Sequence, residues 1–267
     1  MSPLRRVTVA ALLAVAVATV AGGALLWPGG RRAAGCAPAH APVPAAARKA
    51  LAAYAGRIEY TVERLGRERE EIWHDPVTGR TRQVSIDSSG RVTNQFATSF
   101  EGRFELTTSV FYRTHSSIRS RMPAAVRPTQ ANAAADVAQS NRDDVADGKA
   151  TILGRDTIDR RDTLHLRKTV NPPQPKLPAG AFPKDVGRHL LSFRVDTWVD
   201  PLTYLPLRIE TTIRGHSSVM DDSWLPRTAA VLAKTRVAIP AGFKRAYPSQ
   251  GGSDSFSVML KATGCQS

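Results

Sequence analysis

Two acidic residues, each followed by proline, are the first candidates for chemistry in this sequence. Asp200 lies within "WVDPLTYLPLRIE", and Asp75 begins the partial echo "DPVTG". A carboxylate among apolar and aromatic neighbours could act as a general acid or base. The same letters also favour a tight turn, because Asp accepts from backbone N–H groups ahead of it and Pro presets φ at about −65°. A catalytic residue is not expected to recur in a second turn, so we predict structural turns at Asp75, Pro76, Asp200 and Pro201.

The fifth residue of the two predicted turns differs. Gly79 can adopt a positive φ at no steric cost, whereas a positive φ at Tyr204 would be strained. The backbone conformation of Tyr204 in the second turn could therefore differ from that of Gly79 in the first.

Other residue types with chemical potential are scattered. Asp143–Asp144 and Asp221–Asp222 are adjacent pairs whose side chains point apart, and we interpret them as a solvated helix face and a loop. There is no Gly-x-Ser-x-Gly elbow and no Gly-rich phosphate loop. The histidines show no metal-ligand spacing on one element. They are His40, His74, His115, His165, His189 and His216. We predict no catalytic residue, no metal and no cofactor.

The only two cysteines, Cys36 and Cys265, lie near the ends of the chain. In an oxidising compartment such a pair is expected to be bridged, which makes it a disulfide candidate. A bridge closing so long a loop would remove roughly 5 kcal/mol of unfolded-chain entropy. The alternative is one lipidated or unpaired cysteine at each end.

The first 35 residues are expected to direct export rather than to fold. Arg5 and Arg6 precede the uncharged run Val7–Trp27, which is longer than a typical signal core and just long enough to span a bilayer. A retained anchor would leave the domain outside the cytoplasm and attached to the cell membrane. A cleaved signal would give a secreted or periplasmic protein, and "AAGC" ending at Cys36 loosely resembles a lipidation signal.

The chain has a formal net charge of +14, of which about +10 belongs to the part after residue 35. The charge is spread thinly and there is no interleaved aromatic stripe, so nucleic acid is not an expected partner. Attraction to an anionic membrane surface or cell-wall polymer is one interpretation, and general solubility charge is the other.

The hydrophobic pattern predicts an α+β fold with one large antiparallel sheet. A Pro/Ala-rich linker covers 36–47, and a single domain covers 48–267. Helices are expected at Ala45–Tyr54, over about 15 residues starting near Thr129, and around Arg227–Lys234. Alternating segments predict strands at Ile58–Glu63, Glu70–His74, Arg80–Ile86, Val92–Thr98, Phe104–Val110, Lys149–Ile158, Asp162–Val170, Leu190–Asp200, Leu205–Ile213 and Ser255–Cys265. Because one face of such a sheet is apolar, the helices are its expected covers.

Several apolar side chains alternate onto the predicted inner face of the first strands. They are plain core or, in a curved sheet, the lining of a ligand cavity. As candidate apolar ligand-facing residues we take Ile58, Tyr60, Val62, Phe96, Phe104 and Leu106.

The hairpin "W-x-D-P-x-T-x-x-P-x-R-x-E" at Trp198–Glu210 resembles that of the LolA-like lipoprotein-carrier superfamily, which includes mycobacterial lipoproteins and the N-terminal domain of RseB-type regulators. The resemblance spans most of Ala45–Phe243. It implies an open half β-barrel with helices covering the concave face, which binds acyl chains or lipoproteins and carries out no chemistry. The loop Asn171–Gly187 and the tail "WLPRT…IPAGF" depart from the pattern.

The leading hypothesis is a non-enzymatic, extracytoplasmic binding module for an apolar ligand, either a lipid or the acyl chains of a lipoprotein, with a role in their transport. The alternative is a membrane-tethered regulator of the RseB type that senses envelope state and binds a membrane protein partner. An enzyme with an unrecognised site is the third hypothesis. The ligand, the partner, the fate of the N-terminal segment and the oligomeric state are left open.

Overall fold

The computed structural model describes residues 40–124, 132–171 and 192–246. The predicted N-terminal export segment 1–35, Cys36, Cys265 and the predicted strand Ser255–Cys265 lie outside these residues. The same holds for most of the proline-rich loop. The domain boundaries, the disulfide and the membrane anchor therefore stay predictions.

In the part of the chain that the structure describes, twelve strands form one open sheet in the order β12-β6-β5-β4-β3-β2-β1-β11-β10-β9-β8-β7. All neighbours are antiparallel except β12 and β6, which pair in parallel over two residues. The strands are β1 Ile58–Leu65, β2 Glu68–Asp75, β3 Arg80–Ile86, β4 Val92–Glu101, β5 Phe104–Phe111, β6 Ser116–Pro123, β7 Ala150–Ile158, β8 Arg161–Val170, β9 Phe193–Val199, β10 Pro206–Ile213, β11 His216–Leu225 and β12 Lys244–Arg245. Two meanders, β1–β6 and β7–β11, meet where β1 pairs with β11.

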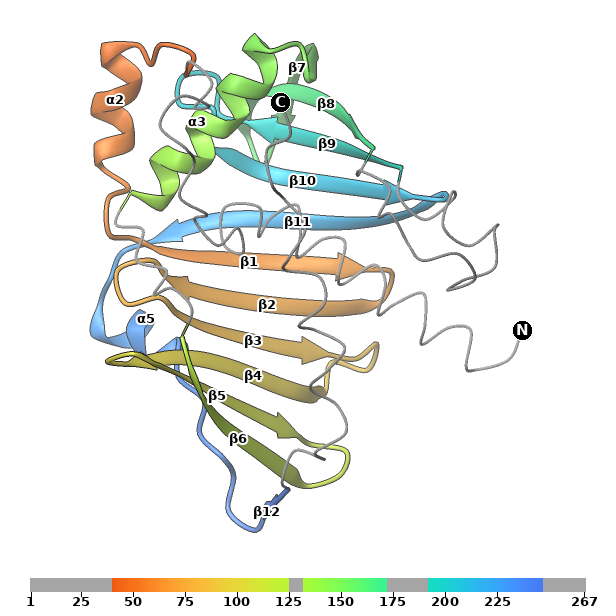
Figure 1. Ribbon diagram of the computed structural model, residues 1–267. Helices are drawn as coiled ribbons and strands as arrows, with labels where there is room; N and C mark the ends of the chain where they lie inside the picture. The colour runs from red at the N-terminus through yellow and green to blue at the C-terminus, as the bar shows by residue number, and fades with distance from the viewer. Residues whose placement is uncertain (1–39, 125–131, 172–191, 247–267) are drawn as a thin grey trace, which may run out of the picture.

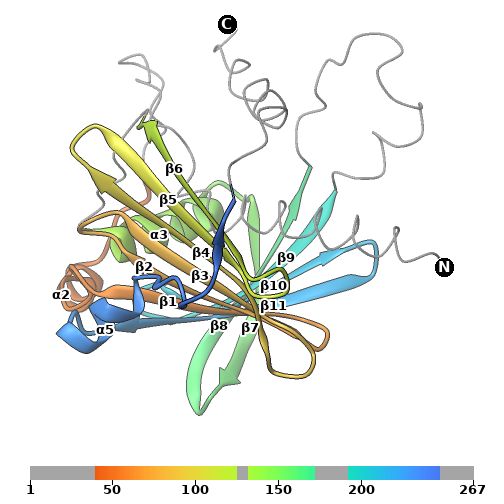
Figure 2. The same cartoon turned by 90° about the horizontal axis from the view of Figure 1, so that it is seen from below.

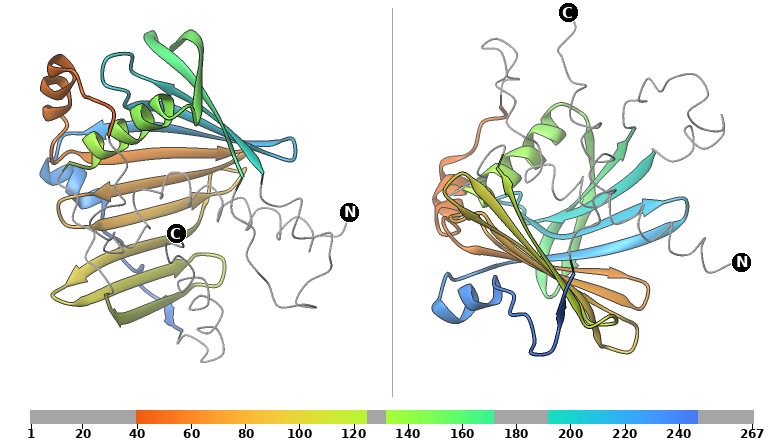
Figure 3. Two further views of the ribbon diagram at one scale, coloured as in Figure 1. Left: turned by 45° about the horizontal axis from the view of Figure 1, so that its top comes forward. Right: turned by 60° about the horizontal axis from the view of Figure 1, so that its bottom comes forward.

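Within the described residues three helices accompany the sheet: α2 Ala45–Ala52, α3 Ala133–Ala146 and α5 Ala229–Lys234. The sheet is strongly curved, and α3 lies on its concave side over the β7–β11 half (Figures 1 and 2). α2 packs beside α3, whereas α5 lies on the opposite side of the sheet (Figure 3). The α+β open half-barrel that the sequence predicts is confirmed, with the refinement that α5 covers the outer rather than the concave face.

The core divides into two clusters on opposite faces. Under α2 and α3, Leu51, Trp224 and Leu205 pack with small residues of α3. On the other face, Ile58 and Trp73 form a cluster against which α5 packs its apolar side chains. Alanine lines the buried side of α3, so this helix approaches the sheet closely. Each face of the curved sheet thus has its own helical cover.

Three strands, β6, β11 and the two-residue β12, are absent from the sequence-based prediction, and β6 and β11 are the long ones. Both are rich in Ser, Arg and Asp, so they lack the alternation of apolar residues that marks a half-buried strand. Asp221 and Asp222, interpreted above as a loop, lie inside β11, where β1 and β10 pair on either side. That interpretation was wrong because pairing on both sides, rather than apolar alternation, holds this strand.

Candidate functional site on the concave face

The Asp75 carboxylate is fully buried in a tight turn, and its partners are structural. Its two oxygens accept from Arg227 Nε at 3.2 Å and Nη2 at 3.0 Å, and from Thr78 Oγ1 at 2.6 Å. Burial alone would raise the pKa of Asp75, but the hydrogen bonds from Arg227 and Thr78 outweigh it and hold the pKa below its usual value. Every strong acceptor site is used within the fold, so this carboxylate has no role left as a general base.

The Asp200 turn has the same backbone geometry as the Asp75 turn, but different residues stabilise it. Asp200 Oδ1 accepts from Thr203 N at 2.7 Å and Thr203 Oγ1 at 2.8 Å. Tyr204 has a φ of 61°, close to the 71° of Gly79. The last residues of the two turns therefore share one conformation, and the different conformation allowed for Tyr204 is not observed. Helix α3 stabilises the strained residue, because Asn141 Nδ2 donates to the Tyr204 carbonyl at 3.0 Å and the Arg142 guanidinium lies 5.0 Å from the ring centroid.

Cross-strand register decides which side chains share a face, since directly opposed residues in an antiparallel pair point the same way. Tyr60 pairs with Trp73, and the line of partners continues through Arg82 to Thr108. We call this side, on which α5 packs, the outer face. Five of the six candidate ligand-facing residues lie on it, and they are Ile58, Tyr60, Val62, Phe104 and Leu106.

Phe96 is the exception among these candidates. It pairs with Gln83 on the opposite side, the concave face, where its side chain is 39% exposed. A register shift between Ser85 and Ile86 places Val92 on the outer face and leaves Phe96 on the concave one. The sequence pattern of each strand gives its alternation but not its register against the next strand. The six residues therefore do not form one surface.

One half of the concave face is apolar. Over β8–β11 it presents buried aliphatic, aromatic and methionine side chains. These are Leu166, Phe193, Val195, Val199, Met220 and Trp224. Sequence analysis missed the contribution of β11 because that strand was not recognised. This half, next to α3, is the part of the concave face that suits an apolar ligand.

The other half, over β1–β4, is polar and acidic. A hollow of about 280 Å³ is lined by Glu70, Gln83, Ser85, Asn94 and Phe96. Ser85 Oγ donates to Glu70 Oε1 at 2.9 Å, whereas the buried Asn94 Oδ1 has no hydrogen-bond partner among the described residues. The concave face is therefore apolar over one half and polar over the other.

Burial changes the protonation of the acids on this face. It raises the pKa of Glu59 to about 8, with the Asp222 charge adding to the effect. It raises the pKa of Glu63 to about 7, and the Glu70 carboxylate directly opposite adds to this. Burial also raises the pKa of Asp222 to about 6, against an opposing hydrogen bond from Thr61. Near neutral pH these carboxyls can therefore carry protons and donate hydrogen bonds.

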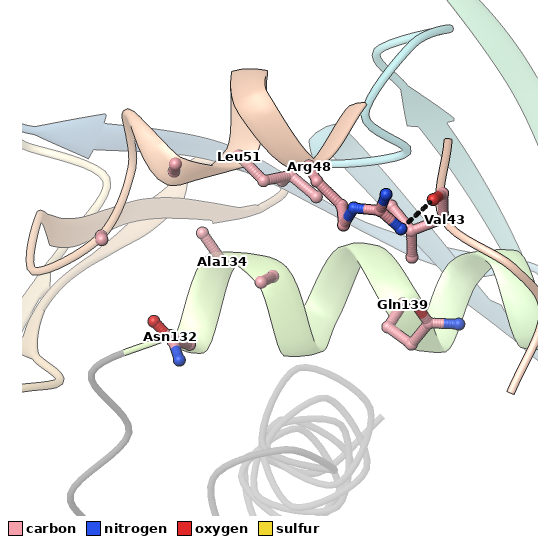
Figure 4. A pocket seen from close by; sticks show the side chains of 9 residues that line it. Val43, Arg48, Leu51, Asn132, Ala134 and Gln139 are labelled. Atoms are coloured by element: carbon pink, nitrogen blue, oxygen red, sulfur yellow. Dashed lines mark hydrogen bonds between the residues drawn. The ribbon is translucent and has the colours of Figure 1, made fainter. Parts of the chain in front are cut away.

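A second hollow, of about 270 Å³, lies between α2 and α3 (Figure 4). We call it the helix slot. Its lining is mainly small and apolar: Val43, Leu51, Ala52, Ala55, Ala134 and Ala135, with Arg48, Asn132 and Gln139 adding polar groups. Leu51 and Ala134 belong both to the slot and to the core that contains Trp224, so the slot adjoins the apolar half of the concave face.

A compact ion cluster occupies the outer face of β8 and β9. Asp196 is buried, shares hydrogen bonds with His165 Nε2 and Arg167 Nε at 2.8 Å, and forms an ion pair with Arg194 Nε, also at 2.8 Å. The His165 ring stacks on Trp198 with centroids 4.5 Å apart. Among the described residues no group of three or more His, Cys, Asp or Glu side chains is placed to hold a metal ion. Within the same residues no helix has the length and apolarity to cross a membrane.

Comparisons with known proteins return similar folds only. No protein-family model and no curated protein sequence matches the chain. An uncharacterized conserved protein from Thermus thermophilus gives a TM-score of 0.42 at 9% identity, covering 76% of this chain and 97% of that one. Mycobacterium tuberculosis lipoprotein LppX gives 0.37 at 12% identity, covering 72% and 95%.

The Pseudomonas aeruginosa MucA/MucB complex gives a TM-score of 0.34 at 13% identity, covering 72% of this chain and 60% of that one. The sheet order itself carries the open half-barrel assignment.

Proposed function

We propose that this chain is an extracytoplasmic, non-enzymatic binding module that holds an apolar ligand, either a lipid or the acyl chains of a lipoprotein. The observation that carries the proposal is the helix slot. It is an apolar hollow of about 270 Å³ between two helices, next to the apolar half of a concave sheet. Few polar groups line it, as is usual for small-molecule sites.

The size of the slot limits what it can do alone. Burial contributes roughly 0.8 kcal/mol per methylene. A micromolar dissociation constant needs about 8.2 kcal/mol, so about ten methylenes must leave water even before ordering costs. The ligand therefore extends from the slot onto the apolar half of the concave face, where Leu166, Val195 and Met220 lie. The polar half, around Glu70, is then available to its headgroup.

The side chains that could do chemistry support a binding role. Asp75 and Asp200 are bound within their turns, and Asp196 is bound by His165 and two arginines. None of these carboxylates is left facing the slot. The predicted export segment, which lies outside the described residues, supports a location beyond the cytoplasm.

The test is lipid occupancy of the full chain, purified in a neutral detergent and examined by native mass spectrometry. We expect a co-purifying lipid mass that disappears after delipidation and returns on adding palmitate. Ala52→Phe places a ring in the slot and should lower palmitate affinity at least tenfold. Ala53→Phe is the matched control, because Ala53 is the next residue and does not line the slot. Equal palmitate binding by both variants would rule out the slot.

A further inference from the structure

Two exposed arginines contact one aromatic ring, and a third lies on the same face, at the end of the sheet farthest from α3 (Figure 1). The guanidinium carbon of Arg121 lies 3.8 Å from the Phe104 ring centroid, and that of Arg103 lies 5.3 Å away. Arg119 follows on the same face of β6, opposite Thr108. Cation–π attraction holds two positive charges against one ring. We call these residues the arginine clamp.

The clamp is not neutralised by the fold. Arg103, Arg119 and Arg121 form no salt bridge among the described residues, whereas Arg64, Arg167 and Arg227 are each paired with an aspartate. Glu105 pairs with Met122 and points to the concave side, whereas Glu101 lies opposite Phe104 on the outer face and forms no salt bridge with these arginines among the described residues. The outer face of β5 and β6 therefore presents a concentrated positive charge with exposed donors.

Apolar surface accompanies this charge. Pro123, which is exposed, lies directly opposite Phe104 on this face, and Phe104 supplies a half-buried ring beside the guanidinium groups. Beyond residues 116 and 117 the free edge of β6 has no pairing strand among the described residues. A surface that combines guanidinium donors with protruding apolar side chains complements phosphate headgroups lying above a hydrocarbon layer.

We propose that the arginine clamp docks the outer face of the β5–β6 hairpin onto an anionic bilayer surface, with lipid phosphates bound by Arg103, Arg119 and Arg121 and with Phe104 and Pro123 facing the headgroups. Phe104 and Leu106, which the sequence offered as ligand contacts, then belong to a membrane-facing surface and not to the ligand cavity. The proposal does not depend on what the helix slot holds.

The test uses the full chain in neutral maltoside micelles, titrated with phosphatidylglycerol or with phosphatidylcholine mixed into the micelles. Each arginine near an anionic surface contributes about a fivefold change in affinity, so Arg103→Gln/Arg119→Gln/Arg121→Gln should weaken phosphatidylglycerol binding on the order of 100-fold. The matched control is Arg155→Gln/Arg160→Gln/Arg161→Gln, which removes the same charge from exposed positions at the β7–β8 hairpin.

We expect phosphatidylglycerol binding to survive in the control and in Ala52→Phe, and to weaken at high salt. Equal weakening in both triple variants would overturn the proposal in favour of general charge attraction. If Arg103→Gln/Arg119→Gln/Arg121→Gln did not weaken phosphatidylglycerol binding, the proposal would also be overturned. The arginines would then serve only to keep the edge strand from pairing with another chain. Displacement of the lipid by millimolar inorganic phosphate would also overturn it, because the site would then take a free anion. Should the triple variant fail to fold, Arg121→Glu must still lose affinity while Arg121→Lys keeps most of it.

Discussion

Removing the arginine that clasps the first Asp-Pro turn should destabilise the protein far more than any change at the second turn. In Arg227→Met the Asp75 carboxylate stays fully buried and keeps only Thr78 and the Val77 amide as partners. Breaking a buried ion pair by removing one partner costs about 3–5 kcal/mol. The Arg227 side chain is 35% exposed, so water compensates in part and we expect about 3 kcal/mol.

The measurement is urea unfolding of the full chain in neutral detergent at pH 7, followed by tryptophan fluorescence. Arg236→Met is the control, because Arg236 is exposed and forms no ion pair among the described residues. Asp200→Asn tests the second turn, whose carboxylate is only half-buried and is bound by its own turn. We expect it to cost about 1 kcal/mol.

The pH dependence of the unfolding free energy provides a second test of the Arg227–Asp75 ion pair. The folded-state pKa of Asp75 lies below its usual value of 3.8, so its contribution is fully present above that pH and is lost as the pH falls through the folded value. The difference between wild type and Arg227→Met should therefore shrink in acid. A loss of less than about 1 kcal/mol in unfolding free energy at pH 7 would refute the stabilising role of the Arg227–Asp75 pair. A difference between wild type and variant that does not change with pH would refute it as well.

Two further outcomes follow from burial. The pKa of Glu59 is raised from 4.5 to about 8, so its effect on folding is absent below 4.5 and becomes increasingly unfavourable as the pH rises to 8. Glu59→Gln should therefore raise the melting temperature relative to wild type at pH 8.5 but not at pH 5; the same change in melting temperature at both pH values would contradict this. Ile58→Ala should cost about 2–5 kcal/mol in urea unfolding, because Ile58 is fully buried. Val62→Ala, at a half-buried position of the same strand, should cost about 1 kcal/mol, and equal losses would place Ile58 outside the core.

The sequence predicts this fold well where local chemistry decides it. Alternation locates most strands, and α3 lies within a few residues of its predicted start. The Asp-Pro turns are readable because their hydrogen bonds are made within four residues. The local sequence does not reveal which distant arginine stabilises each turn. Arg227 and Arg142 come from distant segments, and no spacing rule connects them to Asp75 or Leu202.

The candidate site was harder to predict for a related reason. Which side of the curved sheet Tyr60 and Phe104 occupy depends on register between strands and on which face α3 covers. A single register shift in β4 separates Phe96 from them. Strand β11 adds Met220 and Trp224 to the concave face, yet its serines and aspartates hide it from a search for apolar alternation. The polar half of that face was missed because its acids come from three different strands.

The location of the bound chain tests the central proposal most directly. A fatty acid carrying a photoreactive diazirine near its methyl end should be bound by the delipidated full chain, irradiated, and its attachment sites mapped by tandem mass spectrometry. We expect labels on Leu51, Ala52 or Ala135 of the helix slot and on neighbouring concave-face residues such as Met220. Labels confined to Tyr60 and Val62 on the outer face, or labelling that excess palmitate does not suppress, would contradict the account.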